Sequence, residues 1–330
     1  MFKRSTTLLS LMGALCLGGC ALGPSKPNSL STVAPGKVLP NSYTARTEPI
    51  RLLSWNVEHF VDEYDDPYIE NDREDEPDAA MVERTVLLAK ALRTINADIV
   101  VLQEFESENF ARQIAEKYLE DLNYEYFSAS ESPTWYMNVV VMSRIPLGVH
   151  YSYKNVFTPV VGQTNEDGTP AQQSNINTRM WAVDVIPNEE YVFTLTGVHL
   201  KAGGGDRNAA MRTGQYDFLK GQFQRFLNER PEANLLMVGD FNSYPESPEL
   251  AGFLAPSGRV KLINPTAEKE FLTHPAEEPS RQLDYIIYNN NMAAEITPES
   301  VQIAPGVSRE DMIKIADHLP LLVEFTPRDK

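Results

Sequence analysis

The sequence predicts an α/β fold in which mixed β-sheets are covered by helices. Short apolar runs, typical of buried strands, alternate with amphipathic segments of helical spacing up to residue 240. The stretch from 283 to 326 is rich in strands instead. Such alternation followed by a strand-rich end indicates mixed sheets with helices on their faces. The chain has 330 residues, 42% of them hydrophobic, which is enough for a large core, and we expect one folded domain over residues 49–327.

The first 48 residues are predicted to lie outside that domain. The basic segment MFKRS precedes the apolar stretch TTLLSLMGALCL, which is typical of a signal peptide and too short for an ordinary membrane-spanning helix. LGGC at 17–20 resembles a bacterial lipobox, so we expect a signal peptide over 1–19 and lipidation of Cys20. A plain secretory signal is the alternative. Residues 20–48 are rich in Pro, Ser and Gly and predict a disordered tether.

Strands and helices are predicted to alternate in the first half of the domain. Residues 50–57 form an apolar run, and 81–95 carry apolar side chains at helical spacing. The run ADIVVLQEF at 97–105 predicts the next strand, and a helix is expected over 108–122. NVVVMS at 138–143 predicts a strand that is buried on both faces, because every position but its ends is apolar.

The second half of the domain opens with a polar stretch, 155–178, that predicts a long loop acting as a lid or as a substrate-selecting element. WAVDVI at 181–186 and YVFTLTGVHL at 191–200 then predict a hairpin. The glycine-rich KAGGGDRN leads into an amphipathic helix over 208–229, which is followed by a strand at 234–240.

One loop of the predicted domain is unusually acidic. Residues 62–78 contain ten acidic residues and one arginine. The segment suits a solvated loop, a calcium-binding loop or a device that keeps polyanionic substrates away. Its spacing differs from that of an EF-hand, which needs a central glycine and a terminal glutamate.

Polar side chains gather at the ends of the predicted strands. Six of them end apolar runs: Asn56, Glu58, Glu104, His199, Asp240 and Asn242. Three others come just before an apolar run: Asp284, Asp317 and His318. If the last two strands run antiparallel to the others, all of these groups reach one edge of the sheets.

Five carboxylates at one edge predict a divalent cation. Like charges within several ångströms raise each other's pKa, so these groups cannot all stay ionised without a counter-charge. The donors are carboxylates and an Asn amide, and both cysteines of the chain lie in the first 20 residues. Hard oxygen donors of this kind favour Mg²⁺ or Mn²⁺ over zinc.

The motifs at these positions occur in the order seen in one known superfamily. They are WNVE (55–58), QE (103–104), VVMSR (140–144), GVHLK (197–201), GDFN (239–242), LDYI (283–286) and DHLP (317–320). Over about 50–326 the chain resembles the endonuclease/exonuclease/phosphatase superfamily, which includes deoxyribonuclease I. The resemblance implies a four-layer sandwich of two packed mixed β-sheets flanked by helices. It also implies a metal-dependent phosphoesterase that uses an activated water.

The same resemblance implies a role for each polar residue at the edge. The residues expected to hold the metal are Asn56, Glu58, Glu104 and Asp317. Asp284 is expected to orient His318 and to raise the basicity of its imidazole. Asp240 would position or deprotonate the attacking water, and Asn242 would hold that water or a phosphoryl oxygen. His199 would donate a hydrogen bond to the phosphate.

Other cations and histidines carry a weaker pattern. Lys201 and Arg144, at the ends of two motifs, are expected to contact the substrate phosphate. We expect Arg207 and Arg212 at the solvated surface. We expect structural or surface roles for His59, His150 and His274.

The substrate remains open between two classes. HLKAGGGDRNAAMR followed by GDFN resembles bacterial extracellular nucleases, so hydrolysis of DNA or RNA is our first expectation. Phospholipid, nucleotide or sugar-phosphate substrates are the alternative, because a net charge of −17 opposes nonspecific binding of polyanions. Phe105 stands where relatives of deoxyribonuclease I often have a basic residue. PSRQLDYI replaces the PxWxDR element of inositol phosphatases, which argues against that substrate. A remote alternative is an inactive binding lipoprotein.

The expected location follows from the lipobox. Ala21, and not Asp, follows Cys20. We therefore expect a monomeric lipoprotein of the cell envelope, anchored in the outer membrane of a Gram-negative bacterium.

Overall fold

The computed structural model describes residues 45–174 and 176–329. The chain divides into two units, Met1–Pro35 and Gly36–Lys330, and every described residue belongs to the second. The predicted signal peptide, Cys20 and most of the predicted tether lie outside the described residues. Within the described part, no helix is long and apolar enough to cross a membrane.

Two β-sheets of six strands each form the centre of the second unit. The strands of the first sheet are β1 (Ile50–Phe60), β2 (Ile99–Phe105), β3 (Tyr126–Ala129), β4 (Asn138–Ser143), β13 (Gln302–Ile303) and β14 (Leu321–Phe325). Those of the second are β5 (Leu147–Tyr151), β8 (Met180–Val185), β9 (Phe193–His199), β10 (Asn234–Asp240), β11 (Leu262–Ile263) and β12 (Asp284–Asn289). The strand orders are β13–β14–β1–β2–β4–β3 and β11–β12–β10–β9–β8–β5, and both sheets are mixed.

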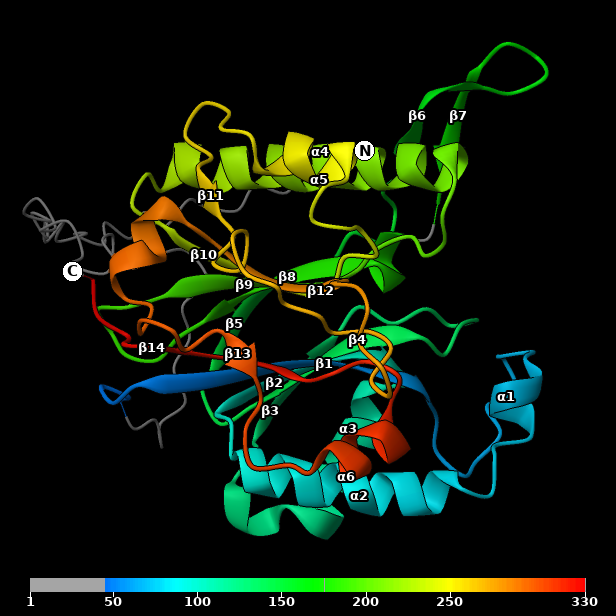
Figure 1. Ribbon diagram of the computed structural model, residues 1–330, viewed down its shortest axis with the longest axis vertical. Helices are drawn as coiled ribbons and strands as arrows, with labels where there is room; N and C mark the ends of the chain where they lie inside the picture. Colours follow the sequence, from blue (N-terminus) through cyan, green and yellow to red (C-terminus); the bar gives the residue numbers. More distant parts are fainter. Residues whose placement is uncertain (1–44, 175, 330) are drawn as a thin grey trace, which may run out of the picture. The chain divides into compact units, whose positions relative to one another are not determined.

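Helices cover the outer face of each sheet, which confirms the predicted four-layer sandwich (Figure 1). The α-helices are α1 (Asp72–Asp75), α2 (Met81–Ile95), α3 (Glu108–Tyr118), α4 (Asp206–Glu229), α5 (Pro248–Leu254) and α6 (Arg309–Ile315). Short 3₁₀ turns are η2 (Glu120–Leu122), η3 (Ile176–Thr178) and η4 (Asn290–Ala294). Helices α2, α3 and α6 lie on the first sheet, and α4 and α5 lie on the second (Figure 1).

The layers are joined by three apolar cores. The core between the sheets includes Leu52 and Ile99 from the first sheet and Trp181 and Leu236 from the second. Two further cores lie under the helices on either side. Because the central strands are covered on both faces, β4, β8, β9, β10 and β12 are buried along their whole length. This burial explains why these strands read as continuous apolar runs.

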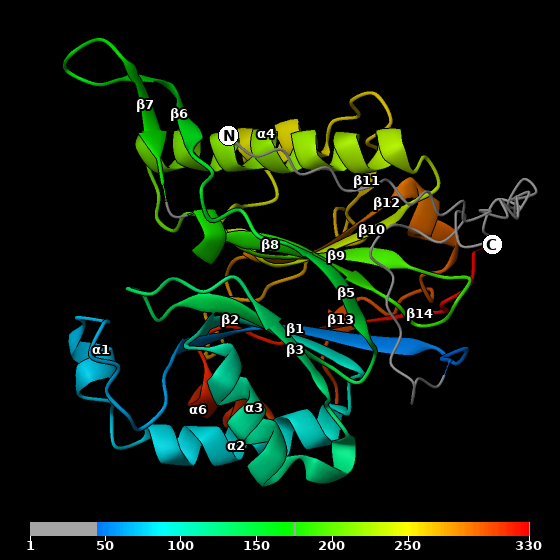
Figure 2. The same cartoon turned by 180° about the vertical axis from the view of Figure 1, so that it is seen from behind.

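The polar stretch 155–178 differs from the loop that we predicted. It contains a two-stranded sheet of β6 (Thr158–Thr164) and β7 (Pro170–Gln173), whose tip projects past the end of α4 (Figure 2). The hairpin packs closely on that helix, because a Cβ added at Gly214 of α4 would lie 2.0 Å from the carbonyl oxygen of Pro159. This contact with α4, which is distant in sequence, stabilises strands that the local pattern does not reveal.

The last two long strands run antiparallel to their neighbours, as a single polar edge requires. β12 pairs antiparallel with β10, and β14 pairs antiparallel with β1. The starts of β12 and β14 therefore lie beside the ends of β10 and β1. This confirms the condition under which all the predicted polar groups meet at one edge.

Candidate active site

Three of the predicted residues form a row across the second sheet. In the strand register, Asp240 of β10 pairs with His199 of β9 on one side and with Asp284 of β12 on the other. Directly paired residues point to the same face of a sheet. All three side chains are buried. The register alone therefore brings together groups that are separated by 41 and 44 residues in the sequence.

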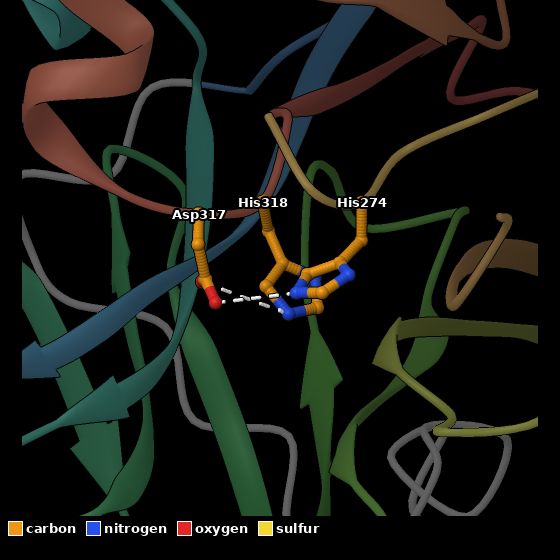
Figure 3. Close-up of side chains that lie close together, drawn as sticks. All are labelled: His274, Asp317 and His318. Carbon is orange, nitrogen blue, oxygen red and sulfur yellow. Dashed lines mark hydrogen bonds and ion pairs between the residues drawn. The ribbon is translucent and has the colours of Figure 1, made fainter. Parts of the chain in front are cut away.

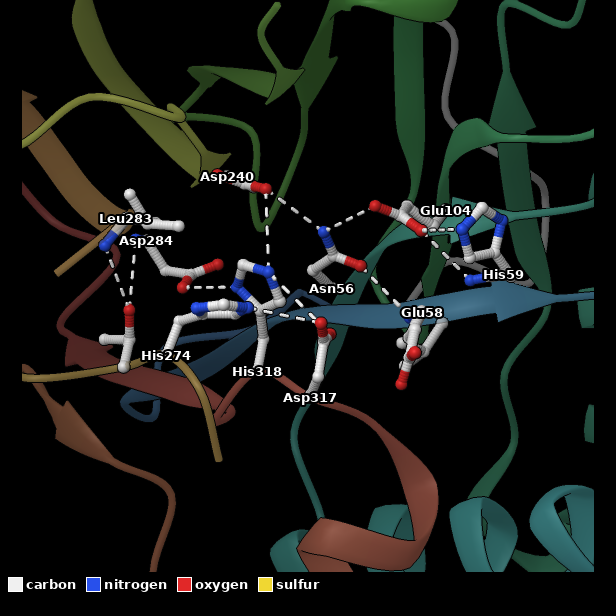
Figure 4. Close-up of polar contacts among 12 residues, drawn as sticks. Asn56, Glu58, His59, Glu104, Asp240, His274, Leu283, Asp284, Asp317 and His318 are labelled. Atoms are coloured by element: carbon white, nitrogen blue, oxygen red, sulfur yellow. Dashed lines mark hydrogen bonds and ion pairs between the residues drawn. The ribbon is translucent and has the colours of Figure 1, made fainter. Parts of the chain in front are cut away.

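The first sheet contributes an amide and a carboxylate that contact this row (Figure 4). Nδ2 of Asn56 donates to Oδ2 of Asp240 at 3.1 Å and to Oε1 of Glu104 at 3.2 Å. Glu58 reaches Asn56 through its backbone, whose amide lies 3.1 Å from the Asn56 Oδ1. Because Glu58 makes this contact through its backbone and not through its carboxylate, the metal role of that carboxylate stays a prediction.

Unusual backbone conformations shape the ends of the strands at this edge. Glu58, His59, Glu104 and Asn242 have φ values of 51°, 46°, 55° and 49°. Left-handed conformations are uncommon outside glycine, and where other residues adopt them they are found at helix caps, in turns and at active sites. The β1–β2 pairing shifts register between Asn56 and Phe60, and the Glu104 backbone lies within a similar shift between β2 and β4. The side chains at this edge are therefore aimed by irregular strand ends.

Asp284 and His318 form a buried pair, as expected. Nδ1 of His318 lies 2.8 Å from Oδ2 of Asp284. Burial alone would lower the pKa of His318, but the charge and hydrogen bond of Asp284, with the charge of Asp240, raise it to about 10. The Trp55 Nε1 also donates to the His318 carbonyl at 2.9 Å, which holds the backbone. His318 is thus a cationic donor whose Nε2 faces Asp240 at 3.9 Å.

Asp240 is the most enclosed carboxylate of the row. Burial and the nearby charge of Asp284 raise the pKa of Asp240 to about 7. Asn242 limits this effect, because its backbone amide donates to Oδ1 of Asp240 at 2.8 Å and its Nδ2 to Oδ2 at 3.0 Å. A carboxyl group that is poised near neutral pH can accept a proton from water.

His199 differs from His318 in its surroundings. Burial lowers its pKa to about 4, assisted by Arg179 and opposed by Glu104, whose Oε1 lies 3.6 Å from Nε2. Its Nδ1 has no hydrogen-bond partner among the described residues. His199 is therefore neutral at pH 7, and its Nε2, which faces two carboxylates, carries the proton.

His274 belongs to the site, which corrects the structural or surface role that we expected (Figure 3). Its Nε2 lies 3.2 Å from Oδ2 of Asp317, while Nε of Arg281 donates to its Nδ1 at 2.9 Å. A guanidinium only donates, so Nδ1 must be the acceptor and Nε2 must carry the proton given to Asp317. The Ala276 amide also donates to the Asp317 carbonyl at 2.6 Å. The loop before β12 thus holds Asp317 in place.

His59 is also at the site, again contrary to its expected role. Its backbone amide donates to Oε2 of Glu104 at 3.0 Å, and its ring Nδ1 lies 2.7 Å from the hydroxyl of Tyr136. Its position directly after the WNVE motif was a signal that could have revealed it. His150 has the structural role expected, since it is bonded to Ser128 at 2.8 Å.

Arg144 lies at the wrong end of the sheet for its predicted phosphate contact. β4 runs antiparallel to β2, with Ser143 paired to Ile99 at the start of β2. The Arg144 guanidinium lies 2.6 Å from Oδ1 of Asn96 and 3.7 Å from Oδ1 of Asp98. Glu104 is at the other end of β2. The predicted contact of Arg144 with substrate is therefore wrong, because the strand direction carries it away from the site.

Lys201 and a partly buried arginine that we did not predict flank the row on the β9 side. Arg179 is close enough for its charge to act on His199, and its carbonyl accepts from the His199 amide at 2.8 Å. Lys201 and Arg179 line a hollow of about 290 Å³ together with Trp135. Arg212 departs from the solvated role expected, because it is buried and bonded to Glu249 at 2.8 Å.

A second hollow lies on the other side of the row, next to β12. It has a volume of about 480 Å³, and its lining includes Tyr244, the cationic Lys269 and Arg281, and the acidic Glu246 and Glu270. Tyr244 follows the GDFN motif and is 45% exposed, so its ring is available to a ligand. The catalytic row therefore lies between two hollows that both carry cationic and aromatic side chains.

The donors at this edge fit a divalent cation. Glu104, Asp317 and Asn56 offer hard oxygen atoms, and the side chains of Glu104 and Asp317 are 16% and 42% exposed. Contacts link them through Asp240 and His318, since the Asp317 Oδ1 lies 3.8 Å from the His318 Nε2. Glu104 and Asp317 are thus joined by a chain of contacts at one edge, and a cation there would stabilise their ionised forms.

The fold and this edge define a class of phosphoester-cleaving proteins. The model of the Endonuclease/Exonuclease/phosphatase family matches residues 53–318, and the chain belongs to that family, whose members are typically metal-dependent. It is an endonuclease/exonuclease/phosphatase-family phosphoesterase. A comparison with curated proteins found no match.

Solved structures resemble the chain in fold. TDP2 of D. rerio, complexed with single strand DNA product, is 17% identical with a TM-score of 0.56, and the match covers 84% of this chain and 99% of that chain. The human Nocturnin catalytic domain with bound sulfate anion is 18% identical with a TM-score of 0.54, covering 85% and 94%. An endonuclease/exonuclease/phosphatase from Beutenbergia cavernae is 16% identical with a TM-score of 0.52, covering 84% and 72%.

Proposed function

We propose that the protein hydrolyses phosphodiesters in nucleic acid. The observation that carries this proposal is the pair of hollows on either side of the His199–Asp240–Asp284 row. A phosphodiester has a substituent on each side of its phosphate, so a site with room on both sides suits it better than a monoester. Arg179 and Lys201 in one hollow and Arg281 in the other would contact flanking phosphates, whereas Lys269 is paired with Glu299 at 2.7 Å.

Trp135 and Tyr244 give each hollow an aromatic ring. Bases of single strands stack on exposed aromatic side chains, and each stacked base contributes about 1–3 kcal/mol. This local chemistry offsets the repulsion that a net charge of −17 exerts on a polyanion, because charges farther away than about 8–10 Å are screened by salt.

The residues of the site have separate parts in the proposed reaction. Asp240 accepts a proton from a water that Asn242 helps to hold, and the water oxygen attacks phosphorus. His318, kept cationic by Asp284, donates to a phosphoryl oxygen as charge develops there, and the neutral His199 donates through Nε2. The P–O bond opposite the water breaks, and the departing alkoxide takes a proton from solvent. The products are a phosphomonoester and an alcohol.

Glu104, Asn56 and Asp317 are proposed to hold the cation, with Mg²⁺ or Mn²⁺ as the ion. When bound, such an ion stabilises negative charge on the phosphoryl group. Oxygen donors without thiolates support this choice over zinc. All of the proposed catalytic groups come from one chain, so the proposed reaction needs no second subunit, and we propose a monomer.

The test is hydrolysis by purified protein of plasmid, single-stranded DNA, a bis-aryl phosphodiester, an aryl monoester and sphingomyelin, with Mg²⁺ or Mn²⁺. We expect both nucleic acids and the diester to be cleaved. His318→Ala and Asp240→Ala should each lower the rate about 10²–10⁴-fold, which assigns the activity to this protein. Cleavage of sphingomyelin or the monoester alone would replace nucleic acid with a smaller substrate.

We further propose that the protein is anchored in the cell envelope through a lipid on Cys20. An acyl chain contributes about 0.8 kcal/mol per buried methylene, so the chains of a bacterial lipoprotein make its release from a membrane negligible. Cys20→Ser should therefore leave an unlipidated precursor. Wild-type protein found free in the medium would contradict the anchor.

A further inference from the structure

The acidic loop after β1 contains a buried carboxylate that lacks a partner. Glu74, on the short helix α1, is fully buried. Its Oε1 accepts from the Asp66 amide at 2.7 Å, but its Oε2 has no hydrogen-bond partner within the described residues. A buried carboxylate oxygen without a donor is costly, and native proteins pair such atoms with a donor or a cation.

The surroundings of Glu74 are anionic. One oxygen each of Asp65, Glu74 and Asp75 lie within 4.8 Å of one another. Burial raises the pKa of Glu74, and the charges of Asp65, Asp66 and Asp75 raise it further. α1 stands apart from the helices that cover the first sheet, so the loop itself shields Glu74 (Figure 1). The loop thus gathers one buried and two exposed carboxylates, and a cation would give the unpaired Glu74 oxygen a partner.

We propose that Asp65, Glu74 and Asp75 form a second cation site, suited to Ca²⁺ and separate from the catalytic edge. Ca²⁺ binds oxygen at 2.3–2.6 Å, so two of its ligands lie at most about 5 Å apart, and the spacing of this cluster meets that limit. Ca²⁺ also tolerates irregular loop geometry and takes 6–8 oxygens, including backbone carbonyls and water. Mg²⁺ requires a near-octahedral set at shorter distances.

The site connects the loop to the edge where the catalytic groups lie. The loop follows β1, whose end carries Asn56 and His59, and α1 also carries Arg73. Asp65 lies in the loop, whereas Glu74 and Asp75 lie on α1. A cation bound by all three would therefore tie α1 to the loop that follows β1.

The experiment is a calorimetric titration of the full-length protein with CaCl₂ in excess Mg²⁺, which occupies the catalytic donors. We expect one Ca²⁺ per chain and a rise of the melting temperature on binding. Glu74→Gln should weaken Ca²⁺ binding at least 10-fold. Asp75→Asn, a change at an exposed position, should do the same if Glu74→Gln fails to fold.

Two controls separate this site from bulk charge and from the catalytic edge. Glu70→Gln removes the same charge from an exposed position of the loop and should bind Ca²⁺ like wild type. Glu104→Gln should retain the Ca²⁺ site while losing activity. Ca²⁺ binding that disappears in Glu104→Gln and persists in Glu74→Gln and Asp75→Asn would overturn the proposal. So would wild-type protein that binds no Ca²⁺.

Discussion

Oδ2 of Asp284 lies 2.8 Å from Nδ1 of His318, and both side chains are almost completely buried. The two residues come from different sheets, since Asp284 begins β12 and His318 precedes β14. Their contact therefore joins the two layers at the edge where the other polar groups converge. It also determines the charge of the histidine, because the pKa of His318 rises to about 10 although burial opposes the charged form.

Asp284→Asn should lower the pKa of His318 and the rate of hydrolysis together. The amide removes the negative charge that raises the pKa, so burial then favours the neutral imidazole. We expect a fall of at least one unit in the NMR titration of His318 in chelated protein, and a rate loss of about 10²–10⁴-fold with metal. An unchanged His318 titration would mean that Asp240 and Asp317 supply the stabilisation instead.

Chelation should abolish activity without unfolding the protein. EDTA removes the cation that Glu104, Asn56 and Asp317 are proposed to hold, while the three apolar cores remain. We expect rates at background in EDTA, full recovery with Mg²⁺ or Mn²⁺, and an unchanged far-ultraviolet circular dichroism spectrum. The Glu74→Gln variant should likewise lose its activity in EDTA and recover it with Mg²⁺ or Mn²⁺, because Glu74 lies outside the catalytic edge. Equal rates with and without chelator would rule out the metal-dependent mechanism.

His274→Ala should weaken metal binding more than it slows catalysis. The imidazole, oriented by Arg281, donates to Asp317 at 3.2 Å, and loss of such an outer partner costs about 10–100-fold in metal affinity. We expect a higher metal concentration for half-maximal activity and near-normal kcat at saturation. His274→Gln, which retains a donor, should restore part of the affinity. His150→Ala is the control, and an equal effect there would indicate a general loss of structure.

Gly239→Ala should destabilise the fold and misplace Asp240. Gly239 has φ of 139°, and an added Cβ would lie 1.9 Å from the carbonyl oxygen of Val198 on β9. We expect a loss of at least about 1–3 kcal/mol in urea unfolding. Gly221→Ala, in α4 with open space around the Cβ, should be neutral or stabilising by about 0.4–1 kcal/mol. Similar stability of the two variants would contradict the close approach of β9 and β10.

Glu295→Gln should remove part of the pH dependence of stability. Burial and the charge of Asp329 raise the pKa of Glu295 to about 7, despite its bonds with Tyr191 and Asn234. The folded protein then holds a proton that the unfolded chain, with a pKa of about 4.3, has released. The stabilisation is present below pH 4.3 and disappears as the pH rises to 7, by up to about 4 kcal/mol.

The measurement for Glu295 is urea unfolding at pH 5 and pH 8. Wild type should lose more stability over this interval than Glu295→Gln does. Glu232→Gln removes a charge at an exposed position and should behave like wild type. If all three proteins change equally, Glu295 does not titrate as described.

Local sequence was sufficient to predict most of the regular elements. α2 and β4 have the predicted bounds, because an amphipathic period and a continuous apolar run each identify one element. The helix expected over 108–122 ends at Tyr118 and continues as η2. β6 and β7 were missed, because their stability depends on packing against α4.

The sequence by itself determined which polar groups lie at the ends and starts of the strands. That these groups meet at one edge depended on the antiparallel directions of β12 and β14. The tertiary structure alone decided their partners. The register of β9, β10 and β12 aligns His199, Asp240 and Asp284, and strand direction takes Arg144 away. His274 and Asp317, for example, are in contact although they lie 43 positions apart in the sequence. Such contacts arise from loop closure and packing between layers, which no local pattern of side chains encodes.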